Sequence, residues 1–320
     1  MLASLIIATR NRRAALVATL QALDRVARPA GLTVEVLVID NGSTDDTRAA
    51  VNATPLALGA TRYLHESRPG KSQALNTALG AARGEVLLFL DDDVRPGAGW
   101  LCEIAAPLGE RRLDAVAGAV RIAPHLLRPW MRPAHLAWLA ATHELATAQP
   151  PSAVGANLGI HRHVLARVAG FDPRLGPGRL GLWEDTLFSA QLVRAGYRLG
   201  FVPAAEVEHH FDPARLSRAS FLAHAQRQGR SAAYVAWHWD HAPSGPTSRL
   251  ALRYRLRRGA KRLLRRADCA RTEGIATWEM DLTCGIAFAD QFRIEQRGPR
   301  AYGPADTAPH VAAPEVFSSP

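Results

Sequence analysis

The sequence predicts an α/β protein with one mostly parallel sheet flanked by helices, followed by a helical C-terminal extension. Short apolar segments rich in β-branched residues alternate with amphipathic helical segments over the first two-thirds of the chain. Polar or acidic residues follow several of these apolar segments directly, as at the binding edge of an open α/β sheet. After Ser217 the strand pattern stops and the spacing becomes helical.

The expected strands share an apolar composition and a length of a few residues. They are Ser4–Ala8, Val34–Ile39, Arg62–Leu64, Glu85–Leu90, Asp114–Ile122, Ala153–Ile160 and Tyr197–Val202. Helical spacing lies between them, at Arg13–Leu23, Ser72–Ala82, His163–Ala169 and Glu184–Ala195. Ser43, Thr44 and Asp45 are candidate caps for a further short helix. Because helices alternate with strands, both faces of the sheet should be covered.

Composition limits the class of protein. The chain has 320 residues, a net charge of +10 and three scattered cysteines, Cys102, Cys269 and Cys284. Such cysteines indicate neither a disulfide framework nor a zinc site, which fits a reducing compartment. The N-terminus looks like a first strand and not a signal peptide, and no apolar stretch approaches the roughly 20 residues of a spanning helix. We therefore expect a cytoplasmic protein, with the excess positive charge favouring anionic partners.

The strongest site candidate is the acidic run Asp91, Asp92 and Asp93, which ends an apolar strand. Two carboxylates with substrate phosphates are a common way to hold Mg²⁺ or Mn²⁺. The alternative is a solvated acidic turn. Asp40 ends the second strand in the same way and should lie on the same edge, as a contact to a ribose or base, or as an Asx-turn residue before Gly42.

Glu184 and Asp185 follow a glycine-rich loop and open a helix. A carboxylate there suits a general base, or simply favours the positive end of the helix dipole. His209 and His210 follow a strand, and either is a candidate for a metal or phosphate contact. Histidines at 161, 163 and 237–241 have spacings that suit no standard zinc site, so we expect structural roles for them.

Two nucleotide-binding signatures are imitated but not met. Gly70-Lys71-Ser72 resembles the end of a phosphate-binding loop, but His65 stands where that loop requires glycine. The turn after the first strand, ATRNRRAA, contains no glycine, so the dinucleotide-binding fingerprint is excluded as well.

Five segments in order resemble family 2 glycosyltransferases of the GT-A fold. They are SLIIATRNR, VLVIDNGSTDDT, RPGKSQALNTAL, VLLFLDDDVRP, and GANLGIHRHVLARVAGFD with the following WEDTLFSAQLVRAGYRLGFVPAAEVEHH. The resemblance covers roughly residues 1–230, which we expect to be the catalytic domain. Residues 231–296 would then be a basic helical extension, and 297–320 a disordered tail rich in proline and alanine.

The resemblance implies roles for individual residues. Thr9, Arg10, Asp40, Lys71, Asp91 and Asp92 would contact the nucleotide sugar. Asp91, Asp93 and His209 would hold Mg²⁺ or Mn²⁺, with Asp93 favoured for direct contact and His210 as the alternative to His209. Asp185 would be the general base of an inverting transfer to a hydroxyl of a saccharide, lipid-linked or small-molecule acceptor. The processive members' QxxRW motif is replaced by AQRQGRSAAY, which favours the addition of one sugar.

The C-terminal stretch Arg249–Arg266 lies outside the resemblance and is densely basic, with leucines spaced like one helix face. It is either an attachment to an anionic membrane surface or a helix that packs its leucines on the rest of the protein. A nucleic-acid partner is disfavoured because Tyr254 is the only aromatic residue in the stretch. A nucleotidyltransferase and an inactive sugar-nucleotide-binding relative are the closer rivals.

Overall fold

A computed structural model describes residues 1–142 and 153–303 of the chain. These form two compact units, one of residues 1–179 and 184–211, the other of residues 180–183 and those from Asp212 onward. The expected boundary at residue 230 falls inside helix α7 (Arg218–His238), which belongs to the second unit. Most of the expected tail, from residue 304 to the end, lies outside the described residues.

The first unit is built on a sheet whose described strands have the order β3-β2-β1-β4-β7-β6-β8-β5. They are β1 (Leu2–Thr9), β2 (Thr33–Asp40), β3 (Ala60–His65), β4 (Val86–Asp91), β5 (Val94–Pro96), β6 (Ala115–Ile122), β7 (Asn157–His161) and β8 (Leu199–His209). Strands β3, β2, β1 and β4 are mutually parallel, as are β6 and β8. Strands β7 and β5 are antiparallel to their neighbours. The predicted mostly parallel α/β sheet is confirmed.

Three helices of the first unit match expected segments, namely the first, third and sixth, whereas the fourth and fifth were not predicted. They are α1 (Arg13–Leu23), α2 (Thr47–Asn52), α3 (Lys71–Ala81), α4 (Trp100–Gly109), α5 (Pro133–Trp138) and α6 (Glu184–Arg194). The predicted helix at His163–Ala169 is wrong, since the chain there forms only a short 3-10 turn, Arg162–Ala166.

The predicted cap of the second helix is also wrong. Asp46 precedes α2 and no side chain caps it. Asp45 instead accepts hydrogen bonds from the backbone N–H and hydroxyl of Thr47. Ser43 Oγ accepts from the Asn11 backbone N–H. These short polar side chains hold a turn before the helix and do not cap it.

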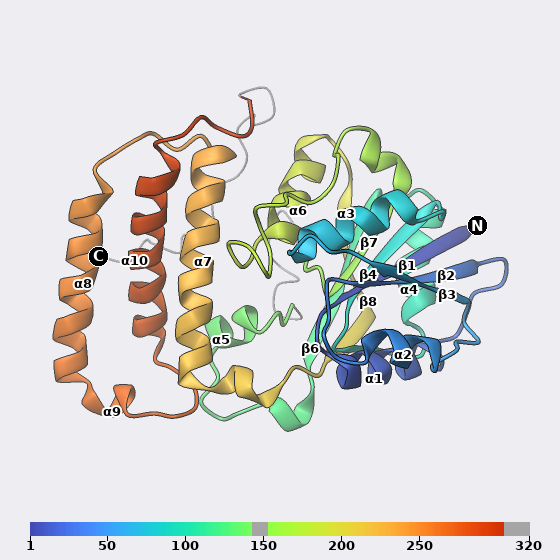
Figure 1. Ribbon diagram of the computed structural model, residues 1–320, viewed down its shortest axis with the longest axis horizontal. Coiled ribbons are helices and arrows are strands. Elements are labelled where there is room, and N and C mark those ends of the chain that lie inside the picture. Colours follow the sequence, from blue (N-terminus) through green and yellow to red (C-terminus); the bar gives the residue numbers. More distant parts are fainter. Residues whose placement is uncertain (143–152, 304–320) are drawn as a thin grey trace. The chain divides into compact units, whose positions relative to one another are not determined.

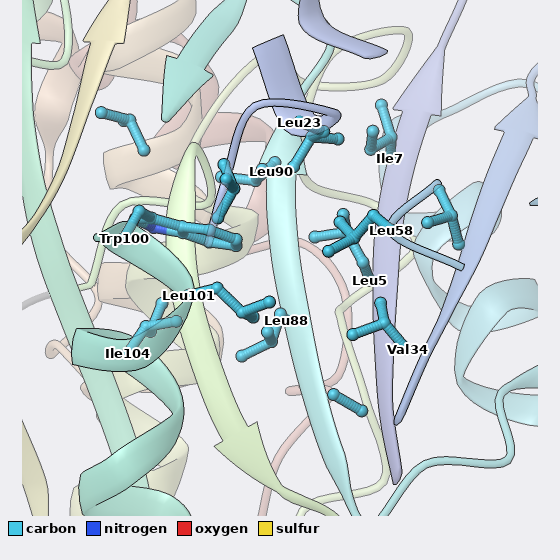
Figure 2. Packing of buried hydrophobic residues seen from close by; sticks show 14 of the residues in the cluster. Leu5, Ile7, Leu23, Val34, Leu58, Leu88, Leu90, Trp100, Leu101 and Ile104 are labelled. Carbon is cyan, nitrogen blue, oxygen red and sulfur yellow. The ribbon is translucent and has the colours of Figure 1, made fainter. Parts of the chain in front are cut away.

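Alternating side chains of the central strands bury both faces of the sheet. On one face Leu88 of β4 packs near Leu101 and Ile104 of α4, and Leu5 of β1 lies near Leu58, as Figure 2 shows. On the other face Phe89 of β4 joins a separate core with apolar residues of α3 and α6. The period of two in each strand produces this division. Helices on both faces therefore leave the ends of the parallel strands as the accessible edge.

The second unit consists largely of α7, α8 (Thr247–Leu264), the short α9 (Arg266–Cys269) and α10 (Thr277–Glu295). Helix α10 lies between α7 and α8 (Figure 1). Gly229 permits the close approach of α7 to α10, because a Cβ there would lie 2.2 Å from Cys284 O. The helical prediction for Arg249–Arg266 is confirmed by α8. Among the described helices, none has the length and apolar character needed to cross a bilayer.

Candidate active site at the carboxyl edge of the sheet

The carboxyl ends of β1, β2 and β4 bring the sequence candidates to one edge. Thr9 pairs in register with Asp40 on β2, and Ala8 pairs with Asp91 on β4. The expectation that Asp40 and the acidic run share a sheet edge is therefore confirmed. After Asp91 the chain turns through Asp92 and Asp93 into β5.

Asp92 and Asp93 are buried and share an ion pair with Arg12. The Arg12 Nη1 lies 3.0 Å from Asp92 Oδ1 and 2.7 Å from Asp93 Oδ2. Thr9 Oγ1 donates to Asp92 Oδ2 at 2.6 Å, and Thr19 Oγ1 donates to the Asp92 carbonyl. Burial raises the pKa of Asp92 to about 6, against the opposing charge of Arg12 and with the added repulsion of Asp93. The turn is thus fixed by polar contacts on several sides.

Arg12 is a site residue that the sequence did not distinguish from its neighbours. Burial alone would lower its guanidinium pKa, but Asp92 and Asp93 raise it. Arg10, the predicted nucleotide contact, is exposed at the end of β1. The turn between them passes through Asn11, whose φ of 52° reverses the local course of the chain. The only feature of the sequence that could have indicated this pairing was a basic turn after one strand and an acidic turn after another.

Lys71 connects the acidic run to the Glu184-Asp185 pair. Its Nζ lies 2.5 Å from Asp91 Oδ1 and 3.6 Å from Glu184 Oε1. Burial opposes the charge of Lys71, but Asp91 and Glu184 outweigh it and raise the lysine pKa. Burial, then repulsion from Asp185, raises the pKa of Glu184 to about 7, although Lys71 opposes the shift. Four charged groups from three segments that are distant in sequence therefore form one electrostatic cluster.

Asp185 is positioned by backbone donors on both carboxylate oxygens. The Gly155 N–H donates to Oδ2 at 2.7 Å, and the N–H of Thr186 donates to Oδ1 at 2.7 Å. A Cβ at Gly155 would lie 3.5 Å from Asp185 Oδ2 and 3.6 Å from Lys71 Nζ, which places this residue in direct contact with both charged groups. Each oxygen retains a further lone pair for a proton.

Asp40 is held in place by its own turn. The Ser43 N–H donates to Asp40 Oδ1 at 2.7 Å, and Tyr63 OH donates to Oδ2 at 2.7 Å. The first contact reaches three residues along the chain, one more than in the Asx turn that the sequence left open as the alternative, and it fixes the turn that follows β2. Burial, followed by the hydrogen bond to Asp40, raises the pKa of Tyr63 to about 12. The carboxylate lies at the edge of the site with both oxygens already accepting hydrogen bonds.

The two adjacent histidines have different surroundings. His209 is buried, with Nε2 3.3 Å from Asp93 Oδ1 and Nδ1 3.0 Å from the carbonyl of Leu139. His210 directs Nε2 to Glu208 Oε1 at 2.5 Å. Because a carbonyl only accepts, Nδ1 of His209 carries a proton, and its Nε2 faces Asp93. A cation shared by Nε2 and the Asp93 carboxylate would make this approach favourable.

The histidines for which the sequence predicts structural roles make local contacts. His163 Nε2 lies 3.2 Å from Asp114 Oδ1, and His163 stacks near His161 with ring centroids 4.6 Å apart. His238 Nε2 lies 3.1 Å from Glu295 Oε2 within the second unit. These contacts agree with the expected structural roles.

The donor chemistry of the acidic turn fits a hard divalent cation. Asp91 and Asp93 supply carboxylate oxygens, and His209 Nε2 faces Asp93. In the described residues no three histidine, cysteine or acidic side chains converge as a ready metal site. Arg12 and Lys71 instead provide the positive charge beside these acids.

Comparison with known proteins gives the same family that the sequence motifs resemble. The model of a family described as glycosyl transferase family 2 matches residues 4–167. The succinoglycan biosynthesis protein ExoM of Rhizobium meliloti is 30% identical over 227 residues, covering 69% of this chain and 70% of that protein. Glucosyl-3-phosphoglycerate synthase of Mycolicibacterium paratuberculosis is 43% identical over 67 residues, and this match spans only 20% of either chain.

A solved structure supports the fold over nearly the whole chain. The mannosyltransferase PcManGT of Pyrobaculum calidifontis, in complex with GDP-Man and Mn²⁺, superposes with a TM-score of 0.57 at 20% identity. The match covers 95% of this chain and 76% of that one. The GT-A architecture is thereby shown, since identity at this level carries the fold alone.

Proposed function

This chain belongs to glycosyl transferase family 2, and we propose that it transfers one sugar from a nucleoside-diphosphate sugar to a hydroxyl acceptor with inversion. The observation that carries the proposal is the bridge made by Lys71 between Asp91 and Glu184. It joins the acidic turn, the proposed diphosphate side, to the pair that contains Asp185, the proposed base. These are the two halves that a single-displacement transfer requires.

The proposed reaction is a proton transfer coupled to a displacement. The acceptor hydroxyl gives its proton to the Asp185 carboxylate while its oxygen forms a bond to the anomeric carbon. The bond from that carbon to the diphosphate breaks, and its electron pair leaves with the diphosphate. The hydrogen bonds from Gly155 and Thr186 keep Asp185 in one orientation, so that little reorganisation precedes the transfer.

Charge on the departing diphosphate needs positive groups nearby. Lys71 is buried and already cationic, and it lies beside Asp91 at the sheet edge. A divalent ion, when bound, would add Lewis-acid neutralisation of the diphosphate. We assign its ligands to Asp91, Asp93 and His209, with His210 set apart by its contact with Glu208. Mn²⁺ and a nucleotide sugar are also the ligands named for PcManGT.

Nucleotide binding is proposed for the neighbouring strand ends. Thr9 and Arg10 at the end of β1, and Asp40 at the end of β2, lie beside the acidic turn in the sheet register. Asp92 would act through Thr9 and Arg12, which it holds by hydrogen bonds. The addition of a single sugar is proposed because AQRQGRSAAY, inside α7, lacks the QxxRW motif.

The test is a panel of sugar nucleotides incubated with the whole protein, with Mn²⁺, Mg²⁺ or a chelator. Release of nucleoside diphosphate is expected from one class of donor, with a rate that falls when the metal is removed. Release that is unaffected by chelator would contradict the metal role. The absence of release from every donor, also with candidate acceptors present, would contradict the transfer itself.

A further inference from the structure

Helix α8 exposes its leucines instead of burying them. Leu252, Leu256 and Leu263 are 56%, 66% and 68% exposed, and Leu264 at the end of the helix is 83% exposed. The first three are separated by four and seven residues, so they form one row along the helix. A helix in a bundle usually turns such a row to the core. Within the second unit these leucines are therefore exposed and form no part of the helical core.

The opposite face of α8 contacts α10 through ion pairs and through the ring of Tyr254. Arg255 Nη2 lies 2.6 Å from Asp290 Oδ2, and Arg262 Nη2 lies 2.8 Å from Glu279 Oε1. Ala251 is the single buried residue of α8. Both arginines remain about half exposed, so these ion pairs lie at the edge of the contact with α10 while the leucines face outward.

A second row of basic residues runs next to the leucines. Arg249, Arg253 and Arg257 are exposed and follow one another at a spacing of four. No acidic residue occurs between Asp240 and Asp268, so nothing in α8 itself offsets this charge. We call the two rows together, Leu252/Leu256/Leu263 and Arg249/Arg253/Arg257, the leucine–arginine face.

We propose that the leucine–arginine face binds the surface of an anionic phospholipid bilayer. Leucines enter the boundary between headgroups and acyl chains, while arginines beside them contact lipid phosphates. The helix has 18 residues, about 27 Å at 1.5 Å per residue. It would lie in the plane of the interface and not cross it, because the arginines continue along its length. The proposal is independent of the transfer chemistry.

The chemistry of the face favours lipid over nucleic acid. Proteins that hold single strands combine basic side chains with exposed aromatic rings for base stacking. Tyr254, the aromatic residue of α8, packs inward, since a Cβ on Gly285 of α10 would lie 2.8 Å from its Cε2. A row of exposed leucines has no counterpart in phosphate-backbone recognition, whereas it matches an acyl boundary.

Co-sedimentation of the full chain with vesicles tests the proposal. Vesicles of phosphatidylglycerol and phosphatidylcholine should bind the protein at low salt, and vesicles of phosphatidylcholine alone should bind it weakly. The triple substitution Arg249→Gln, Arg253→Gln and Arg257→Gln should lower the partition coefficient about a hundredfold, at roughly fivefold per residue. The triple substitution Leu252→Ser, Leu256→Ser and Leu263→Ser should lower it at least tenfold.

Matched controls distinguish binding through the leucine–arginine face from binding that depends only on net charge or on exposed apolar area. Arg25→Gln, Arg28→Gln and Arg83→Gln remove the same charge from exposed positions of the first unit and should leave most of the binding. Leu127, 49% exposed outside α8, provides the control for leucine. All replaced side chains are exposed, so circular dichroism should show folded variants.

Four results would overturn the proposal. The wild-type chain could fail to bind the anionic vesicles at low salt. The two control sets could reduce binding as much as the α8 variants do. Light scattering could instead show a dimer that the leucine variant converts to monomer, with no vesicle binding, which would make the face a contact between copies. Binding to RNA in place of vesicles would equally exclude the lipid surface.

Discussion

Lys71 Nζ lies 2.5 Å from Asp91 Oδ1 and thereby fixes the first turn of α3 to the end of β4. The same ammonium group is 3.6 Å from Glu184 Oε1, at the start of α6. One cation therefore holds together two acids that lie far apart in the sequence. Its removal would leave both carboxylates in a poorly solvated place.

Replacing Lys71 with methionine should lower the free energy of unfolding by about 2–3 kcal/mol, because two largely buried acids lose their common partner. Urea unfolding followed by circular dichroism measures this. Adding Glu184→Gln to the variant should recover part of the loss, since one of the unpaired acids is then removed. A cost that is unchanged in the double variant would show that Lys71 acts without Glu184.

Glu184→Gln alone should stabilise the protein increasingly as the pH rises. Burial and Asp185 raise the folded-state pKa of Glu184 to about 7 from 4.5. Protonated Glu184 therefore adds to the free energy of unfolding at low pH. This contribution is lost between about pH 4.5 and 7, where the carboxyl group ionises in the folded protein. The variant should gain about 2 kcal/mol relative to wild type between pH 5 and pH 8. A difference that does not change with pH, measured by urea unfolding, would contradict the shifted pKa.

Arg12→Gln tests the balance of charge in the acidic turn. The substitution leaves Asp92 and Asp93 without their guanidinium and should cost about 1–2 kcal/mol, a value reduced by the partial exposure of Arg12. Mn²⁺ should raise the melting temperature of this variant more than that of wild type, because the freed carboxylates bind the ion better. The control is Arg13→Gln, whose arginine makes only an exposed contact of 3.8 Å with Asp46. Equal responses to Mn²⁺ in all three proteins would contradict the assignment.

The two neighbouring histidines provide a matched pair for the metal. His209→Gln should weaken the Mn²⁺-induced rise in melting temperature, with at least about a tenfold loss of affinity, because Nε2 beside Asp93 is lost. His210→Gln should leave the affinity close to wild type, since that ring contacts Glu208. Thermal-shift titrations with Mn²⁺ distinguish the two. The reverse order would transfer the role to His210.

Local patterns predicted the sheet because each strand carries its own signal. Leu5, Ile6 and Ile7 lie in one apolar run and are all buried, and their alternation between the two cores follows from strand geometry alone. The shared edge of Asp40 and Asp91 follows from the parallel order of the strands that they end. These features needed no long-range information.

Other features depended on contacts that local patterns do not encode. Three arginines follow β1, and only the turn at Asn11 determines that Arg12 meets the acids. Strand β5 and helix α4 were not predicted. The turn before α4 is short, and Pro107 interrupts the helical pattern of α4. The leucine spacing in α8 predicted that the leucines form a row along the helix. It did not predict which way the row faces, and the ion pairs of Arg255 and Arg262 with α10 turn it away from α10.

Asp185→Asn tests the central claim most directly. Asparagine keeps an oxygen that accepts from Gly155, so the loop should remain in place while the group can no longer take a proton. With the donor identified by the panel, transfer should fall by about 10²–10⁴-fold while the affinity for the nucleoside diphosphate stays within about twofold. Asp114→Asn, an acid paired with Arg198 away from the site, is the control. Wild-type turnover in Asp185→Asn would remove Asp185 from the mechanism and contradict the account.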